Sequence, residues 1–165
     1  PWSLTFIDNQ NLMVTEKPGN IKFINLKEKK IKDISHNLKV LEDGQGGLLD
    51  ILHSNNIVFV SYSENRSNGM SSTSVARAKL NTEKLNFKNI FQARPPINSG
   101  YHFGSRLVIK NKHLYETYLL FSTKTSLELS LRISRTNLSN PSVMLRSLQC
   151  PKRVAKCPTN CRKKN

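Results

Sequence analysis

The sequence is short of cysteine, of acidic residues and of long apolar runs, and each shortage excludes a class of protein. It contains no apolar run of about 18 residues, so it predicts no transmembrane helix. Cysteine first occurs at Cys150, and the spacing to Cys157 and Cys161 suits neither a zinc knuckle nor a paired disulfide framework. The chain opens on Pro1 without a methionine or a signal segment, which predicts a trimmed or processed start.

The shortage of acids gives a net charge of +15, from 26 basic and 11 acidic residues. Such a charge favours a nucleic-acid partner, but its distribution argues against one. Residues 1–112 carry 16 basic and 9 acidic residues, whereas residues 113–165 carry 10 and 2. In the first part lysines are mixed with acids and form no arginine-and-aromatic surface for stacking bases. We therefore predict no nucleic-acid partner, and a steep salt dependence of DNA affinity would contradict this prediction.

Short β-prone runs separated by turn-forming clusters predict an all-β chain. Residues 1–26 read as three strands with two turns, and residues 57–62 form the strongest strand signal. Residues 63–74 are predicted to be a polar loop, and residues 74–80 another strand. Residues 27–40 leave two interpretations open, a helix with an apolar stripe or an exposed strand and loop.

A short apolar unit recurs along the chain, at Leu4–Phe6, Leu49–Ile51 and Leu107–Ile109. Its spacing of roughly 45 to 58 residues is about that of one four-stranded propeller blade. The repeat therefore suggests a β-propeller.

Two glycine-bracketed turns hold the residues best placed for chemistry. His102 lies between Gly100 and Gly104, which let a ligand approach the backbone closely, although a lone loop histidine is more often an ordinary surface group. Gln45 is the only ligand-binding side chain in the glycine-rich turn before Leu48. That turn lacks the lysine and the Ser or Thr of a phosphate-binding loop, so a simple tight turn remains the alternative. The remaining histidines have no metal-site spacing, so the sequence predicts no metal ligands.

Six motifs occur together in one order, and they carry a resemblance to a known family. They are Pro1–Phe6, Val14–Gly19, Asp43–Asp50, Tyr62–Ser63, Thr73–Arg77 and His102–Leu107. Over residues 1 to about 115 the chain resembles the glucose/sorbosone dehydrogenase family, the soluble PQQ-dependent aldose sugar dehydrogenases.

The resemblance implies an all-β fold, an incomplete six-bladed β-propeller with about two blades of antiparallel strands and an irregular C-terminal tail. It implies PQQ and Ca²⁺ as cofactors, with the Ca²⁺ ligands outside this chain. His102 would be the general base that takes the proton from the C1 hydroxyl of an aldose, while the C1 hydride passes to PQQ and a lactone forms. Gln45 and Arg106 would contact the cofactor, and Gln45 and Tyr101 the sugar. Some members have an acid in place of Tyr101, so the sugar preference is expected to differ.

The resemblance also implies an external electron acceptor and a periplasmic or secreted location. A non-catalytic propeller that binds carbohydrate or protein is the alternative function. Because the later blades lie outside the matching region, we expect the isolated chain to be inactive.

Residues 116–165 depart from the family pattern and contain no glycine. Ser, Leu and Arg, the residues with the most codons, are abundant in this segment, which is typical of translation in a shifted reading frame. A genuine tail is the alternative. Alternation at residues 127–133 predicts a strand in either case, and residues 152–165 are predicted to be disordered.

Overall fold

The computed structural model describes residues 1–101, 103–120, 130–137 and 146–149. These residues form strands and turns and no helix, which confirms the all-β prediction. The strands are β1 (Ser3–Phe6), β2 (Asn11–Thr15), β3 (Ile21–Asn25), β4 (Lys30–His36), β5 (Leu48–Ser54), β6 (Ile57–Asn65), β7 (Ser71–Lys79), β8 (Lys84–Leu85), β9 (Lys88–Gln92), β10 (Leu107–Lys110), β11 (His113–Leu120), β12 (Ser130–Asn137) and β13 (Arg146–Gln149).

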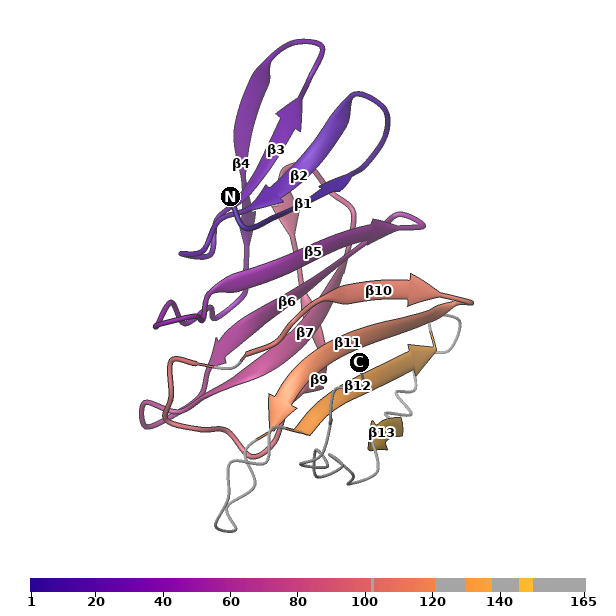
Figure 1. The fold of residues 1–165 in the computed structure, drawn as a ribbon. Coiled ribbons are helices and arrows are strands. Elements are labelled where there is room, and N and C mark those ends of the chain that lie inside the picture. The colour runs from indigo at the N-terminus through magenta and orange to yellow at the C-terminus, as the bar shows by residue number, and fades with distance from the viewer. Residues whose placement is uncertain (102, 121–129, 138–145, 150–165) are drawn as a thin grey trace, which may run out of the picture.

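The strands form three sheets that follow one another along the chain (Figure 1). The first sheet has the order β1-β2-β3-β4-β8, the second β5-β6-β7-β9 and the third β10-β11-β12-β13. Neighbouring strands are antiparallel except for β8, which returns from the second sheet and pairs in parallel with the end of β4. Each sheet is otherwise an up-and-down meander, as expected of a propeller blade.

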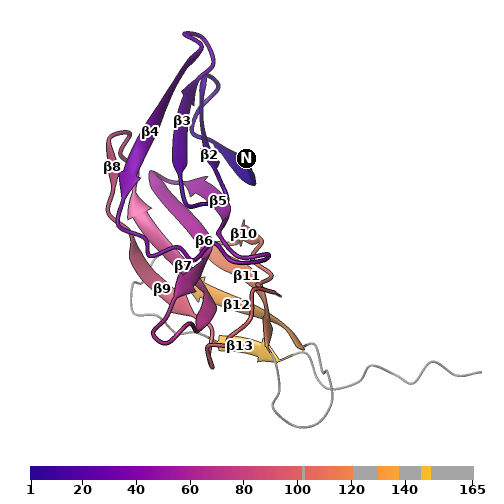
Figure 2. The same ribbon diagram turned by 90° about the vertical axis from the view of Figure 1, so that its left-hand side faces the viewer.

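The first strand of each sheet lies at a common edge. β5 contacts β1 and β2 on one side and β10 on the other. From this edge the three sheets fan outward, as the two views at right angles show (Figures 1 and 2). The arrangement is an open segment of a propeller, and its inner edge is formed by β1, β5 and β10.

The second sheet is buried on both faces, which explains the unbroken apolar run that begins β6. Val58 and Val60 pack between the first and second sheets. Phe59, which points the opposite way, packs between the second and third sheets with Leu107 and Leu114. A strand covered on both faces does not alternate between apolar and polar residues, because both of its faces exclude water.

Two expectations about loops are resolved by the structure. Residues 27–40 contain the strand β4, so the helical interpretation is wrong. The predicted loop at 63–74 is also too long, because β6 continues to Asn65 and β7 begins at Ser71. Polar side chains in these strand ends find hydrogen-bond partners inside the sheet. For example, the hydroxyl of Ser74 donates to Glu64 at 2.6 Å. Buried hydroxyls with partners are compatible with strands, which composition alone does not reveal.

The C-terminal segment contributes β12 and β13 to the third sheet. Alternation at 127–133 predicted a strand there, and β12 covers the part of that range which the structure describes. Residues 152–165, predicted to be disordered, and the three cysteines lie outside the described residues. No helix among the described residues is long and apolar enough to span a membrane.

Candidate active site

The turn that carries Gln45 is built from glycines that lie directly against neighbouring backbone. The Gly46 N–H donates to the Asp43 carbonyl at 2.6 Å and closes the turn. Gly47 has a φ of +149°, in a region that L side chains rarely adopt. A Cβ at Gly47 would lie 2.4 Å from the carbonyl oxygen of Lys17, so a larger residue does not fit. The turn therefore packs closely against the backbone of Lys17, and the side chain of Gln45 is exposed.

The same turn is hydrogen-bonded to the segment that contains the predicted base. The backbone N–H of Gln45 donates to the Gly100 carbonyl at 2.6 Å. A Cβ at Gly44 would lie 2.4 Å from that carbonyl oxygen, so the two backbones touch. Two segments that are distant in sequence, and that both carry predicted site residues, are thus adjacent. Gln45 and Tyr101 lie on adjoining loops, whereas His102 lies outside the described residues.

The neighbours of His102 in the chain show how its segment is held. Tyr101 is 57% exposed, whereas Phe103 is buried. The Phe103 carbonyl accepts a hydrogen bond from Oγ1 of Thr73, on β7, at 2.5 Å. Tyr101 is therefore in solvent, whereas Thr73 holds Phe103 against the second sheet.

Lys17, in the turn between β2 and β3, supports the Gln45 turn from the first sheet. Its Nζ donates to the Gly44 carbonyl at 2.8 Å, and its own carbonyl accepts from Leu48 N–H at 3.1 Å. The ammonium also lies 5.6 Å from the centre of the Trp2 ring, within the range of a cation–π contact. The sequence showed Lys17 only as part of a motif, and its role depends on contacts between two sheets.

Asp50 links the innermost strands of all three sheets. Its Oδ2 accepts the backbone N–H of Leu107, on β10, at 2.8 Å. Its Oδ1 accepts the hydroxyl of Ser3, on β1, and the N–H of Ile51 at 3.0 Å. The side chain is buried, and each of these bonds satisfies part of the carboxylate. Sequence reasoning did not select Asp50, although an acid inside the apolar stretch at 48–51 is a signal for a buried, bonded carboxylate.

Arg106, a predicted cofactor ligand, lies beside this carboxylate. Its Nη1 is 3.6 Å from Asp50 Oδ1, and its side chain is 77% exposed. The contact orients one side of the guanidinium, while most of the group faces solvent. Arg106 can therefore pair with Asp50 and still present N–H donors to an anionic ligand.

The backbone next to Arg106 takes an unusual conformation. Ser105 has a φ of +110°, which is strained for a residue with a Cβ. Its N–H donates to the Thr117 carbonyl at 2.5 Å, and its carbonyl accepts the hydroxyl of Ser61 at 2.6 Å. These two bonds hold the chain in position as it leaves the site and enters β10.

Glu116, on β11, is a second buried carboxyl, in register with Leu107. It is 2% exposed, and among the described residues neither of its carboxyl oxygens has a hydrogen-bond partner. Burial raises the pKa of this carboxyl well above its usual value, because the apolar surroundings disfavour the charged form. No pattern in the sequence singled out Glu116, because a glutamate that faces solvent on a strand would give the same sequence pattern.

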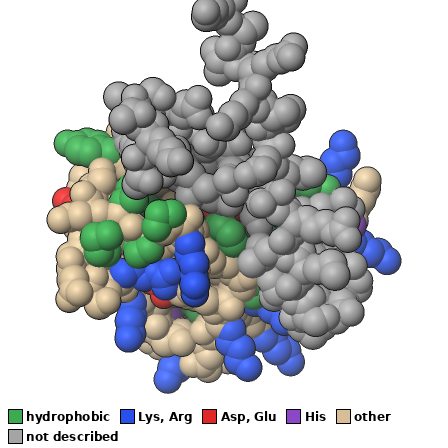
Figure 3. Space-filling model, turned by 90° about the horizontal axis from the view of Figure 1, so that it is seen from below, with side chains coloured by type: hydrophobic (Ala, Val, Ile, Leu, Met, Phe, Trp, Pro, Cys, Tyr) green, Lys and Arg blue, Asp and Glu red, His purple; other side chains and the backbone are tan. Residues whose placement is uncertain are grey.

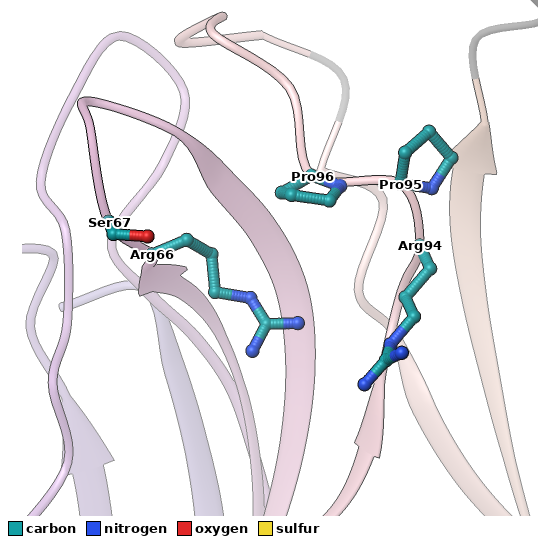
Figure 4. Close-up of a pocket in the computed structure, with 5 residues that line it drawn as sticks. All are labelled: Arg66, Ser67, Arg94, Pro95 and Pro96. Carbon is teal, nitrogen blue, oxygen red and sulfur yellow. The ribbon is translucent and has the colours of Figure 1, made fainter.

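An open hollow of about 790 Å³ lies at the end of the second sheet where β6 ends and β7 begins. It is lined by Arg66, Ser67, Arg94, Pro95 and Pro96, and Figure 4 shows both guanidinium groups extending along its sides. Arg66 is held by Ser72 Oγ at 3.1 Å and lies 3.3 Å from Glu64. Seen from below, hydrophobic side chains gather beside lysine and arginine side chains (Figure 3). Glu64 neutralises Arg66, which is one of the two arginines that line the hollow.

Three sheets packed face to face around β1, β5 and β10 define an incomplete β-propeller. A family model described as Glucose / Sorbosone dehydrogenase matches residues 1–129. The chain therefore belongs to the Glucose / Sorbosone dehydrogenase family. The match runs past residue 115, and the boundary between a family-like part at 1–115 and a tail at 116–165 stays a prediction.

Individual relatives agree with this assignment. The aldose sugar dehydrogenase YliI of Escherichia coli is 30% identical over 121 residues, which are 68% of this chain and 33% of that protein. The crystal structure of the soluble aldose sugar dehydrogenase from Escherichia coli in its apo-form superposes with a TM-score of 0.73 at 26% identity, over 84% of this chain and 44% of the other. The PQQ-bound aldose sugar dehydrogenase of Streptomyces coelicolor shares the fold, with a TM-score of 0.66 at 19% identity over 83% and 44% of the two chains. The chain thus spans about a third of the length of the curated relative and under half of the two structures.

Among the described residues, no group of three or more His, Cys, Asp or Glu side chains is arranged to hold a metal ion. Of the predicted site residues, the structure joins the loops of Gln45 and Tyr101 and places Arg106 on Asp50.

Proposed function

We propose that this chain supplies part of the active site of a PQQ-dependent aldose sugar dehydrogenase, in which the C1 hydroxyl of an aldose is oxidised to a lactone. One observation carries the proposal: the Gln45 turn is hydrogen-bonded to the segment that carries His102, through Gly100. Two loops that carry polar side chains thereby meet, and we propose that these side chains bind the ligands. The family membership supports the class of reaction.

His102 is proposed as the general base. A neutral imidazole, with an ordinary pKa of about 6.5, can accept a proton from a sugar hydroxyl near neutral pH. Glycines on both sides of the Tyr101–Phe103 segment let a sugar approach the backbone there. We propose that Gln45 and Tyr101, on the adjoining loops, bind sugar hydroxyls.

The donor set fits PQQ, a quinone that carries carboxylates. Arg106 offers an exposed guanidinium fixed on one side by Asp50, and Gln45 offers an exposed carboxamide. Both groups can donate hydrogen bonds to carboxylate or quinone oxygens. When bound, PQQ would supply the two-electron acceptor that the C1 hydride requires. We assign Ca²⁺ to residues outside this chain.

The whole reaction is proposed for the complete propeller, with an external electron acceptor and a periplasmic or secreted location. The isolated chain, with PQQ, Ca²⁺ and an aldose, is expected to show no dye reduction. An open set of three sheets exposes surfaces that a closed propeller covers.

A chimera tests the proposed function. Residues 1–129 of this chain would replace the matching segment of the Escherichia coli aldose sugar dehydrogenase, and PQQ-dependent dye reduction with glucose would be measured. We expect activity in the chimera, and a loss of about 100-fold or more in the His102→Gln version, which keeps a polar side chain but no base. A matched control, His113→Gln, lies in the β10–β11 hairpin at the far end of the strand pair and should leave the rate unchanged. A folded, PQQ-binding chimera whose rate is unaffected by His102→Gln would refute the role of the base. Sugar binding without any need for PQQ would favour a binding module instead.

A further inference from the structure

The hollow lined by Arg66 and Arg94 lies at the same end of the second sheet as the Gln45 turn. That turn immediately precedes β5, and Leu48, the first residue of β5, pairs with Tyr62 in the last part of β6. The β6–β7 hairpin closes at this end of the sheet, and Arg66 lies in its loop. The hollow and the candidate active site therefore share one end of the sheet.

The prolines that line the hollow and the Tyr101 loop of the candidate site belong to one short segment of chain. Ile97, in the middle of this segment, is joined to the start of β7 by two backbone hydrogen bonds of 2.8 Å. Gly100, farther along, accepts the N–H of Gln45. From Pro96 to Tyr101 the backbone spans at most about 18 Å, because each residue adds no more than about 3.6 Å. A short oligosaccharide can therefore reach from one to the other.

Arg66 is held in place by polar side chains of the second sheet. Its Nε donates to Ser72 Oγ at 3.1 Å, and its Nη1 lies 3.3 Å from Glu64 Oε2. The Glu64 carboxylate also accepts hydrogen bonds from three further side chains: Ser74 at 2.6 Å, Asn89 at 3.0 Å and Gln92 at 2.8 Å. Among the described residues nothing bonds to Nη2 of Arg66. The guanidinium is therefore fixed on one side and has free N–H donors on the other.

Arg94 adds a second positive charge that no acid offsets. Its side chain is exposed, and within the described part of the chain it forms no ion pair. Figure 4 shows both guanidinium groups extending along the sides of the hollow. Two like charges beside one hollow repel each other, and an anion bound between them would remove this repulsion. Because Glu64 neutralises only Arg66, the hollow keeps an excess of positive charge.

The hollow does not depend on blades outside this chain. All of its lining residues come from the loops of the second sheet. That sheet lies between the first and the third sheet, and β5 contacts both of them. A loop site on a scaffold that is packed on both faces is a usual position for ligand binding.

We propose that the hollow binds the carboxylate of an acidic sugar unit, so that the complete enzyme favours an oligosaccharide that ends in an aldose and contains a uronic acid. The aldose end of this inference rests on the proposed function, whereas recognition of the charge depends on the hollow alone. Guanidinium groups match the two oxygens of a carboxylate. Pro95 and Pro96 add an apolar wall for a sugar ring, and a volume of about 790 Å³ is within the usual range of ligand sites.

Isothermal titration calorimetry of the whole chain, without PQQ, tests the charge recognition. The ligands are an aldotetraouronic acid, which is xylotriose carrying one glucuronic acid unit, and neutral xylotetraose. At low salt, where charges are least screened, we expect the acidic tetrasaccharide to bind about tenfold more tightly or better. Arg94→Gln should remove most of this difference, with unchanged far-ultraviolet circular dichroism. Arg66→Lys, which keeps the charge but loses the planar fork, should reduce it.

Lys88→Gln is the matched control. It removes the same charge from an exposed position at the opposite end of β9 and should leave both affinities unchanged. An equal loss in Lys88→Gln and Arg94→Gln would overturn the proposal, because it would assign the binding to the general attraction of a chain with a net charge of +15. Equal affinities for the two tetrasaccharides would also overturn it. Tighter binding of glucose 6-phosphate than of the acidic tetrasaccharide would assign the hollow to phosphate instead.

The chimera described above tests the link to catalysis. The ratio of kcat/KM for the acidic and the neutral tetrasaccharide should fall about tenfold in Arg94→Gln and stay constant in Lys88→Gln. An active chimera whose ratio ignores Arg94→Gln would overturn the role of the hollow in substrate choice. A chimera that oxidises no sugar would refute the proposed function instead. Calorimetry on the whole chain would then still decide whether the hollow binds an acidic sugar.

Discussion

The carboxylate of Asp50 accepts the backbone N–H of Leu107 at 2.8 Å, and this bond joins the second sheet to the third. The other carboxylate oxygen of Asp50 accepts the hydroxyl of Ser3 from the first sheet. One buried side chain thus fixes the spacing of β1, β5 and β10, the inner edge of the propeller. The turn with Gln45 immediately precedes β5, so the same side chain also positions the loop that we assign to the candidate site.

Removal of the Asp50 carboxylate is predicted to destabilise the fold strongly. Asp50→Ala leaves the buried N–H of Leu107 and the hydroxyl of Ser3 without their acceptor, at about 1–3 kcal/mol for each unsatisfied group. We expect the free energy of unfolding in urea to fall by roughly 2–4 kcal/mol.

Arg106→Ala supplies the matched control for Asp50→Ala. It removes the ion pair but leaves the buried hydrogen bonds, and because Arg106 is mostly exposed the loss should stay below about 1 kcal/mol. Equal losses in the two variants would show that the ion pair, rather than the buried bonds, carries the stability.

Glu116 is predicted to make stability fall as pH rises. Burial raises the pKa of the folded carboxyl, so the folded state retains a proton that the unfolded state loses above its ordinary pKa of about 4.3. The stability is therefore full below about pH 4.3 and declines as pH rises toward the folded pKa. Glu116→Gln, which cannot ionise, should remove this decline, so that the variant gains on the wild type as pH increases.

Urea midpoints of the wild type and of Glu116→Gln, measured at several pH values from 4 to 9, test this. The relevant quantity is the difference between the two curves, since other groups titrate in both proteins. A difference that does not change with pH would mean that the carboxyl is not buried in solution.

Ser105→Gly is predicted to stabilise the chain. At a φ of +110° a Cβ is strained, at a cost of about 1–3 kcal/mol, and glycine removes this strain. Part of the gain is offset because glycine gives the unfolded chain more freedom, so we expect a net increase of roughly 1 kcal/mol. Ser105→Ala, which keeps the Cβ and removes the hydroxyl, is the control. An equal gain in the alanine variant would indicate an effect of the hydroxyl rather than of the backbone.

Much of the fold is predictable from the sequence, because strand alternation and turn clusters are local signals. The first three strands, the strong strand at β6 and the strand at β7 all follow from such patterns. The Gln45 turn was identified from its glycines, but its hydrogen bond to Gly100 depends on contacts between distant segments. The sequence around Glu116 and Ser3 does not indicate that Glu116 is buried or that Ser3 bonds to Asp50. Both features depend on which sheet packs against the strand. Asp50 differs, because an acid inside an apolar strand is a local sign of a buried, hydrogen-bonded carboxylate.

Gly44→Ala is predicted to separate the two loops of the candidate site. A Cβ at this position would lie 2.4 Å from the carbonyl oxygen of Gly100, so the turn must move away and the bond from Gln45 N–H must lengthen. Gly69→Ala is a matched control, because Gly69 also has a positive φ, of +69°, but no atom lies within 4 Å of its Cβ position. Both variants bear the cost of a left-handed alanine, about 1 kcal/mol, so any further loss in Gly44→Ala measures the contact with Gly100. Amide hydrogen exchange at Gln45 should accelerate in Gly44→Ala alone. If both variants lose the same stability and Gln45 stays protected, the two loops are not held together by this close approach.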